Sequence, residues 1–111
     1  MEQTIESLTE GKSLTISLRG EIDHHGAVAV RGQIDEQLYA ERPQTLVLDL
    51  GGVDFMDSAG LGLIMGRYHK TQEIGTELVL RDPSRRVEKM MKMAGLDKMI
   101  RVEYSQKGAN S

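Results

Sequence analysis

Residues 45–68 read TLVLDLGGVDFMDSAGLGLIMGRY and decide the fold. Residues 45–50 are almost continuously apolar, which predicts a central strand covered on both faces. The pair Gly51-Gly52 is expected to end that strand. Beyond it, apolar side chains recur at intervals of three and four residues, which predicts one face of a helix running to about residue 73. That face is formed by Leu61, Ile64, Met65 and Tyr68. Ser58 is therefore expected at a strand-to-helix turn.

Ser58 is the first candidate functional residue. A helix leaves its first backbone N–H groups without partners, and a Ser hydroxyl at this position is a good N-cap. If Ser58 were phosphorylated, the phosphate would face the same N–H groups and the positive end of the helix dipole. Asp54 and Asp57 already place negative charge nearby, so a phosphate would create a strongly acidic patch. We expect such a change to act on a docked partner and to leave the fold intact.

Three glycines, Gly60, Gly62 and Gly66, follow Ser58 in the same predicted helix. Each costs about 1 kcal/mol relative to Ala in a helix interior, so a helix that contains three of them needs a reason. Because Gly62 and Gly66 lie largely off the apolar face, they are expected to leave a flat surface for docking. The alternative is close packing of the helix inside the domain, and each single glycine is open to that explanation.

The segments on either side of this region alternate between strand and helix patterns. The expected strands are residues 4–8, 14–18, 78–80 and 100–104, and the expected helices are residues 27–40 and 84–94. The order β-β-α-β-α-β-α-β implies crossover connections, hence a largely parallel sheet with one antiparallel hairpin. We predict a single small α/β domain over residues 1–104, with a mixed, mostly parallel sheet of four to five strands. Residues 105–111 are expected to form a polar, flexible tail.

Both flanking helices have predicted ends and buried stripes. The helix at residues 27–40 is expected to end before Pro43 and to bury Val30, Ile34 and Leu38. The helix at residues 84–94 is expected to begin with Asp82 as N-cap and Pro83 in the first position. Its predicted buried residues are Val87, Met90, Met91 and Ala94.

The composition argues against several classes of function. The chain has 111 residues, a formal net charge of −3, one Phe, three Tyr and no Trp, so it lacks the positive charge and the aromatic platform typical of nucleic-acid binding. The absence of Cys excludes disulfides, thiolate metal sites and a Cys nucleophile. No apolar run approaches about 18 residues, and the polar start Met1-Glu2-Gln3-Thr4 has no signal core. We expect a cytoplasmic protein with no nucleic-acid or membrane partner.

Enzyme chemistry finds little support at the strand-to-helix turn. The nucleophile elbow requires Gly-x-Ser-x-Gly, but Met56 stands at the first Gly position. The pattern places none of His24, His25 and His69 as a general base. The glycine spacing fits neither a dinucleotide fingerprint nor a P-loop, and no acidic pair precedes Asp49 as a receiver-type phosphoryl acceptor would require. We expect no catalytic residues, no cofactor and no metal site.

The run Asp23-His24-His25 is expected to lie in a loop before a helix. Adjacent His side chains on a loop point in different directions, and no third metal ligand is placed beside them. One interpretation is a solvated loop in which Asp23 or His25 caps the next helix. The other is that Asp23 lies on the Ser58 side of the sheet and joins the same docking surface.

The motif Phe55-Met56-Asp57-Ser58-Ala59-Gly60-Leu61-Gly62 resembles the signature of anti-sigma factor antagonists of the STAS domain class. Three further segments support the resemblance, which extends over residues 4–102: Gly20-Glu21-Ile22-Asp23-His24-His25, Gly66-Arg67-Tyr68 and Met93-Ala94-Gly95-Leu96. The likeness is closest to the sporulation branch, the antagonists of anti-sigma F factors.

This resemblance implies a partner switch controlled by phosphorylation. The unphosphorylated protein would bind an anti-sigma factor that is also a serine kinase with bound ATP or ADP, and so free a sporulation sigma factor. The kinase would inactivate the antagonist by phosphorylating Ser58, and a PP2C-type phosphatase would reverse the change. The implied partner-binding residues are Asp23, Asp57, Ser58, Ala59, Gly60, Gly62, Leu63 and Arg67. The alternatives are a stress-response antagonist of the same family and a module that binds a nucleotide or another anion.

Overall fold

The structure is a computed structural model that describes residues 4–105. Residues 1–3 and, apart from Ser105, the predicted C-terminal tail lie outside the described residues. Five strands form one sheet in the order β1-β2-β3-β4-β5. They are β1 (Thr4–Glu10), β2 (Ser13–Ile22), β3 (Thr45–Met56), β4 (Glu77–Arg81) and β5 (Arg101–Glu103). The β1–β2 pair is antiparallel and the other pairs are parallel, which confirms the predicted fold class and element order.

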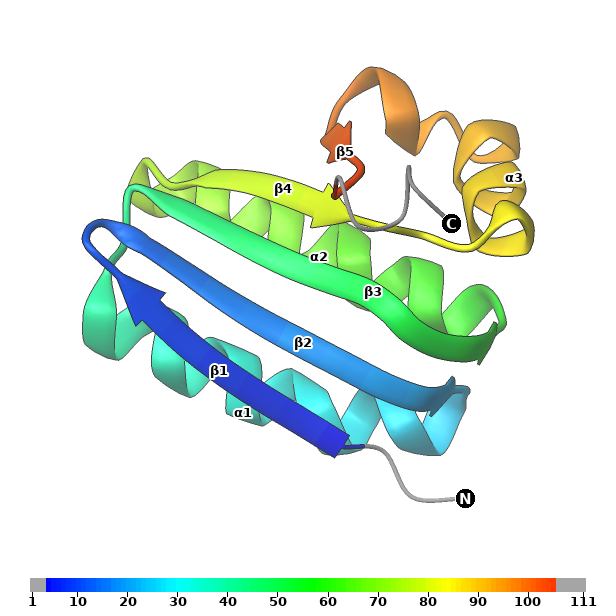
Figure 1. Cartoon of the computed structure of the whole chain (residues 1–111), viewed down its shortest axis with the longest axis horizontal. Helices are drawn as coiled ribbons and strands as arrows, with labels where there is room; N and C mark the ends of the chain where they lie inside the picture. Colours follow the sequence, from blue (N-terminus) through cyan, green and yellow to red (C-terminus); the bar gives the residue numbers. More distant parts are fainter. Residues whose placement is uncertain (1–3, 106–111) are drawn as a thin grey trace.

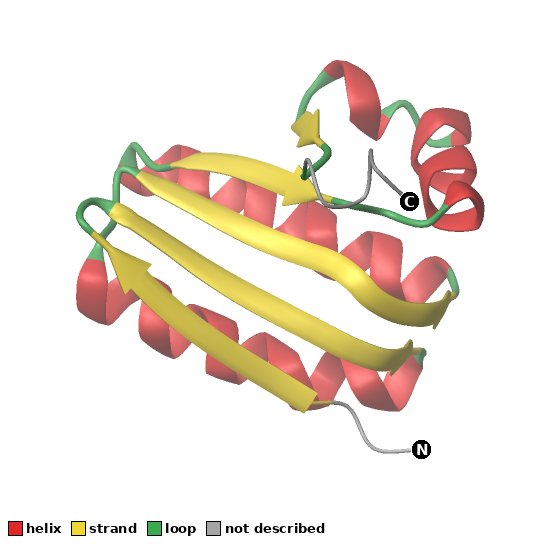
Figure 2. Cartoon of the chain, viewed as in Figure 1, coloured by secondary structure: helices red, strands yellow, loops and turns green. Residues whose placement is uncertain are grey.

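Two long helices cover one face of this sheet. They are α1 (His24–Glu41) and α2 (Ser58–Ile74), which lie side by side behind the strands in the view of Figures 1 and 2. The short helix α3 (Arg85–Met93) lies beyond the end of β4, and a 3₁₀ turn, η1 (Leu96–Lys98), leads from it to β5. Within residues 4–105, no helix is long and apolar enough to cross a membrane.

The hydrophobic core lies between the sheet and the two long helices. Alternate residues of β2 point into it, and the predicted α1 stripe of Val30, Ile34 and Leu38 is fully buried there. Burying one such aliphatic side chain contributes about 1.5–3 kcal/mol relative to leaving it exposed. The core therefore holds both long helices against this face of the sheet.

The strand β3 does not end at Gly51-Gly52, as predicted, but continues to Met56. Its pairing with β2 shifts register between Ser17 and Arg19, and this irregularity absorbs an extra residue. A Cβ on Gly52 would lie 2.8 Å from Cγ of Arg19, so a larger residue does not fit beside the neighbouring strand. The glycines permit a close approach inside a continuous strand, and this is why the chain-break interpretation was wrong.

The starts of α1 and α3 also differ from the prediction. Because β2 runs to Ile22, a single residue separates it from α1, which begins at His24 and not at residue 27. The α3 N-cap is Ser84, whose hydroxyl accepts a hydrogen bond from the backbone N–H of Val87. Asp82, the predicted cap, instead has a left-handed φ of 54° and accepts from the N–H of Ser105.

The buried face of α2 is rotated from the predicted one. Its buried residues are Gly60, Leu63, Ile64, Arg67 and Thr71. Of the predicted apolar face only Ile64 is fully buried, while Leu61, Met65 and Tyr68 pack against the margin of the core. The reason is that α2 contacts α1 as well as the sheet. The last predicted residue of α3, Ala94, is exposed because it follows the helix as its C-cap.

Candidate functional site

Ser58 is the first residue of α2, and the N-cap is its neighbour Asp57. Oδ1 of Asp57 accepts a hydrogen bond of 2.8 Å from the backbone N–H of Ala59. The expectation that Ser58 itself caps the helix was wrong, because β3 extends to Met56 and leaves only Asp57 between strand and helix. The Ser58 side chain, released from capping, is exposed.

Three backbone N–H groups in the first turn of α2 already donate hydrogen bonds to Asp57. The N–H groups of Gly60 and Leu61 both donate to the carbonyl of Asp57, at 3.0 and 3.3 Å, and that of Ala59 is taken by the Asp57 carboxylate. A phosphate on Ser58 would therefore find these donors occupied, contrary to the expectation from the sequence. Much of its charge would face the solvent or a partner, offset in part by the helix dipole.

Asp23 lies at the equivalent position on the neighbouring strand. It is the N-cap of α1, and its Oδ1 accepts a 2.9 Å hydrogen bond from the N–H of Gly26. This hydrogen bond, aided by the nearby His25, lowers the pKa of Asp23. Ile22 and Met56 are direct partners in the parallel β2–β3 pair, and the N–H of Asp57 donates to the carbonyl of Ile22 at 3.4 Å. Asp23 and the Ser58 turn are thus adjacent at one edge of the sheet.

The three glycines of α2 have different surroundings. A Cβ on Gly60 would lie 2.2 Å from Cγ of Met56 and 3.1 Å from the carbonyl oxygen of Ile22, so this glycine is required for packing. Around a Cβ on Gly62 or Gly66 there is nothing within 4 Å. The close-packing interpretation therefore holds for Gly60, and only the other two leave free surface.

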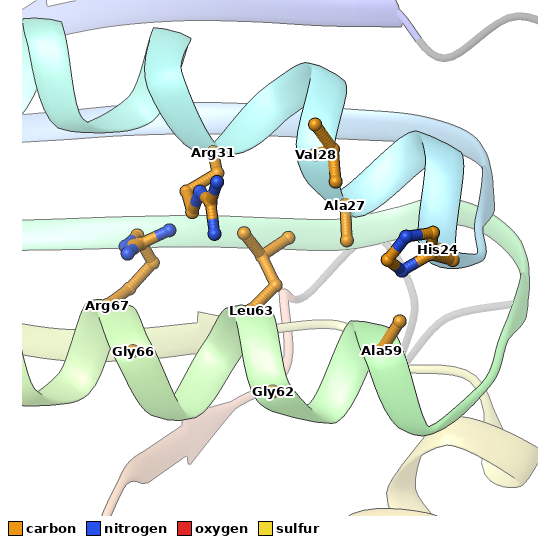
Figure 3. Close-up of a pocket in the computed structure, with 9 residues that line it drawn as sticks. All are labelled: His24, Ala27, Val28, Arg31, Ala59, Gly62, Leu63, Gly66 and Arg67. Carbon is orange, nitrogen blue, oxygen red and sulfur yellow. The ribbon is translucent and has the colours of Figure 1, made fainter.

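A groove of about 230 Å³ runs between α1 and α2 from the Ser58 turn (Figure 3). On the α1 side it is lined by His24, Ala27, Val28 and Arg31. On the α2 side it is lined by Ala59, Gly62, Leu63, Gly66 and Arg67. The bare glycine backbone forms one wall, and the two arginines extend into the space between the helices at one end.

Leu63 and Arg67 lie deep in this groove and not on its rim. They are 5% and 3% exposed, respectively. Nε of Arg67 lies 3.0 Å from Oδ1 of Asp35 on α1, an ion pair without the alignment of a hydrogen bond. Burial lowers the pKa of Arg67, and the positive charge of Arg31 adds to this effect while Asp35 opposes it. Both residues thus help to hold α1 against α2.

Comparison with known proteins identifies the fold family. Residues 4–109 match the STAS domain. The chain belongs to the STAS domain family. An anti-sigma F factor antagonist of Paenibacillus polymyxa is 39% identical over 78% of this chain and 74% of its own length. An anti-sigma-B factor antagonist of Bacillus subtilis is 28% identical over 86% of this chain and 85% of its own length.

Solved structures agree with this assignment. The anti-sigma factor antagonist SpoIIAA in its unphosphorylated form has a TM-score of 0.78 and 24% sequence identity, with 96% of this chain and 94% of that chain covered. Its phosphorylated form has a TM-score of 0.72 and 23% identity, with 96% and 97% covered. At this identity the likeness establishes a shared fold.

Two residues next to Arg67, Arg31 and Asp35, were missed by sequence reasoning. They lie four residues apart, each next to a member of the buried α1 stripe. This spacing places them on one side of the helix, facing α2. The spacing is visible in the sequence, but the sequence does not show that this side of α1 faces α2.

The two adjacent histidines and the methionines of α3 do not form a second site in the STAS domain. The rings of His24 and His25 lie 5.9 Å apart in an edge arrangement. Throughout residues 4–105, no group of three or more His, Asp or Glu side chains is placed to hold a metal ion. Of the methionines near the end of α3, Met91 is buried and Met93 is 80% exposed. We assign neither cluster a role.

Replacing Asp57 with Ala is expected to lower the free energy of unfolding by about 1 kcal/mol, because α2 loses its N-cap. Asp57→Asn, which keeps an oxygen able to accept from the N–H of Ala59, is expected to remain close to wild type. Urea denaturation of the two variants measures the difference. Equal destabilisation by both substitutions would show that the capping hydrogen bond is not what Asp57 contributes.

Proposed function

We propose that this STAS domain is an anti-sigma factor antagonist that docks on its partner through the surface around Ser58. The names of similar proteins support this, since they include antagonists of anti-sigma F and anti-sigma-B factors. The observation that carries the proposal is the exposed side chain of Ser58 at the start of α2, beside the start of α1, where the next three N–H groups of α2 already donate to Asp57. Such a hydroxyl is free for contact with another protein.

Phosphorylation of Ser58 is the proposed control of this docking. A phosphate carries a charge of about −1.5 to −2 at pH 7. Beside the carboxylates of Asp23 and Asp57 it would concentrate negative charge at one edge of the sheet, and the N–H groups of Ala59, Gly60 and Leu61 already have acceptors. The change would be felt mainly by the partner. The similar fold of SpoIIAA in its phosphorylated form is compatible with a switch of this kind.

The proposed partner is an anti-sigma factor with serine kinase activity and bound ATP or ADP, and the domain itself performs no catalysis. A PP2C-type phosphatase would restore the active form, and a sporulation sigma factor would be released. If this chain functions like the anti-sigma-B factor antagonists, the released sigma factor would be a stress-response factor instead. The proposed contact residues are those accessible at the turn: Asp23, Asp57, Ser58, Ala59 and Gly62. We propose that Gly60, Leu63 and Arg67 act from below this surface, through packing and the floor of the groove.

The proposal is tested by incubating the protein with an anti-sigma F kinase and ATP, and separately with an anti-sigma-B kinase. Intact mass spectrometry should detect one phosphate on the wild type and on Ser7→Ala, a control at an exposed serine of β1, but none on Ser58→Ala. Calorimetry should detect binding before phosphorylation and its loss afterwards. Equal labelling of Ser58→Ala would contradict the assignment. Saturable binding of ATP without a kinase would favour the anion-binding alternative.

A further inference from the structure

Arg67 is an unusual residue for the floor of a surface groove. Only 3% of it is exposed, yet it is charged, and its Nη1 has no hydrogen-bond partner among the described residues. Its one ionic neighbour, Asp35, meets it through Nε and is half-buried. A buried guanidinium group is normally stabilised by several hydrogen bonds, frequently to both oxygens of a carboxylate. Nη1 is itself shielded from solvent, so the positive charge of Arg67 lies under the floor of the groove and is only partly compensated.

A second guanidinium group reaches into the same space. Arg31 projects from α1 toward Arg67 in Figure 3, and it has neither an ion pair nor a hydrogen bond to any other described residue. Its charge is close enough to lower the pKa of Arg67. At this end of the groove only Arg67 pairs with Asp35, and Arg31 has no acidic partner among the described residues. The balance of charge is one positive unit in excess.

The shape of the groove limits what can enter it. Its volume of about 230 Å³ is below the range of about 300–1,000 Å³ typical of small-molecule sites. Among the described residues that line it, His24 is the only one with an aromatic ring. The open space over Gly62 and Gly66 lets another backbone approach α2 closely. These features suit a side chain presented by a docked protein better than a nucleotide.

We propose that the groove between α1 and α2 binds an acidic side chain of the docked protein, whose carboxylate pairs with Arg31 above the buried charge of Arg67. This inference rests on the proposed function, because the groove begins at Ala59, next to Ser58. The rest of the docking surface is acidic at Asp23 and Asp57. An acidic side chain of the partner is therefore attracted to this one end of the surface, which would fix the register in which the two proteins dock.

Arg31 is the residue to change, because it is exposed and makes no contact that the fold needs. Arg31→Ala is expected to weaken binding to the anti-sigma factor kinase by about tenfold, and Arg31→Glu by about tenfold to a hundredfold. Arg31→Glu loses more because it places a carboxylate of this chain beside Arg67. Lys12→Glu in the β1–β2 turn makes the same change of charge away from the groove and should bind like wild type. Thermal unfolding checks that all variants are folded.

The outcomes separate this inference from the proposed function. Wild-type protein that fails to bind any anti-sigma factor kinase would overturn both. Wild-type binding together with equal affinities for Arg31→Glu and Lys12→Glu would overturn the groove assignment alone. Inorganic phosphate and ATP should also be titrated onto the protein alone, with the arginine side-chain N–H signals followed by NMR. Saturable binding of either that is lost in Arg31→Ala would show that the groove is a free-anion site and would overturn the proposed partner.

Discussion

Replacing Ser58 with Glu is expected to weaken binding to the anti-sigma factor kinase by about 100-fold or more. A surface fitted to a small neutral hydroxyl offers no partner for a carboxylate, and a charge buried without a partner costs several kcal/mol, where each 1.4 kcal/mol is about tenfold in affinity. The N–H groups of Ala59, Gly60 and Leu61 compensate little, because they already donate to Asp57. Calorimetric titration of the kinase with each variant measures the loss.

Two controls belong to this experiment. Ser58→Ala keeps the site neutral and small, so it should bind almost as tightly as wild type. Ser7→Glu adds the same charge at an exposed position of the edge strand β1 and should also leave binding unchanged. If Ser58→Glu bound as tightly as these two variants, charge at the turn would not control docking. The circular dichroism of all three variants should match wild type, because both serines are exposed and the Ser58 side chain makes no hydrogen bond to another residue of 4–105.

Gly60→Ala is expected to lower the free energy of unfolding by about 2 kcal/mol, although Ala is the better helix former. The added methyl group would lie 2.2 Å from Cγ of Met56 and 2.9 Å from its sulfur. Met56 is itself buried at the end of β3, and a carbonyl oxygen of β2 lies 3.1 Å from the same point. Overpacking of this kind costs about 1–3 kcal/mol, and the helix would have to move away from the sheet.

Gly62→Ala is the control for this substitution, two residues along the same helix. Nothing lies within 4 Å of the added Cβ, so only the helix propensity changes, and the variant is expected to gain up to about 1 kcal/mol. Urea denaturation of the two proteins should therefore give shifts of opposite sign. Similar shifts in both variants would show that Gly60 is not the contact that seats α2 on the sheet.

The sequence predicts the start of α2 to within one residue, but not how its polar groups are used. Asp57 and Ser58 are both good N-cap residues, so the local sequence does not choose between them. The choice is made by the length of β3, which pairs with β2 as far as Met56 and leaves only Asp57 as the link. Capping by Asp57 is what frees the hydroxyl of Ser58.

The sequence by itself determined the order of strands and helices, the position of Ser58 at a strand-to-helix turn, and the buried stripe of α1. These follow from local periodicity and turn residues. Only the tertiary structure decided which face of α2 is buried. Apolar residues and glycines occur on most sides of this helix, and α2 packs against both α1 and the sheet. The same contact buries Arg67 against Asp35 and brings Arg31 beside it. A pairing between two helices separated by a strand has no local signal, so the groove was not predictable from the sequence.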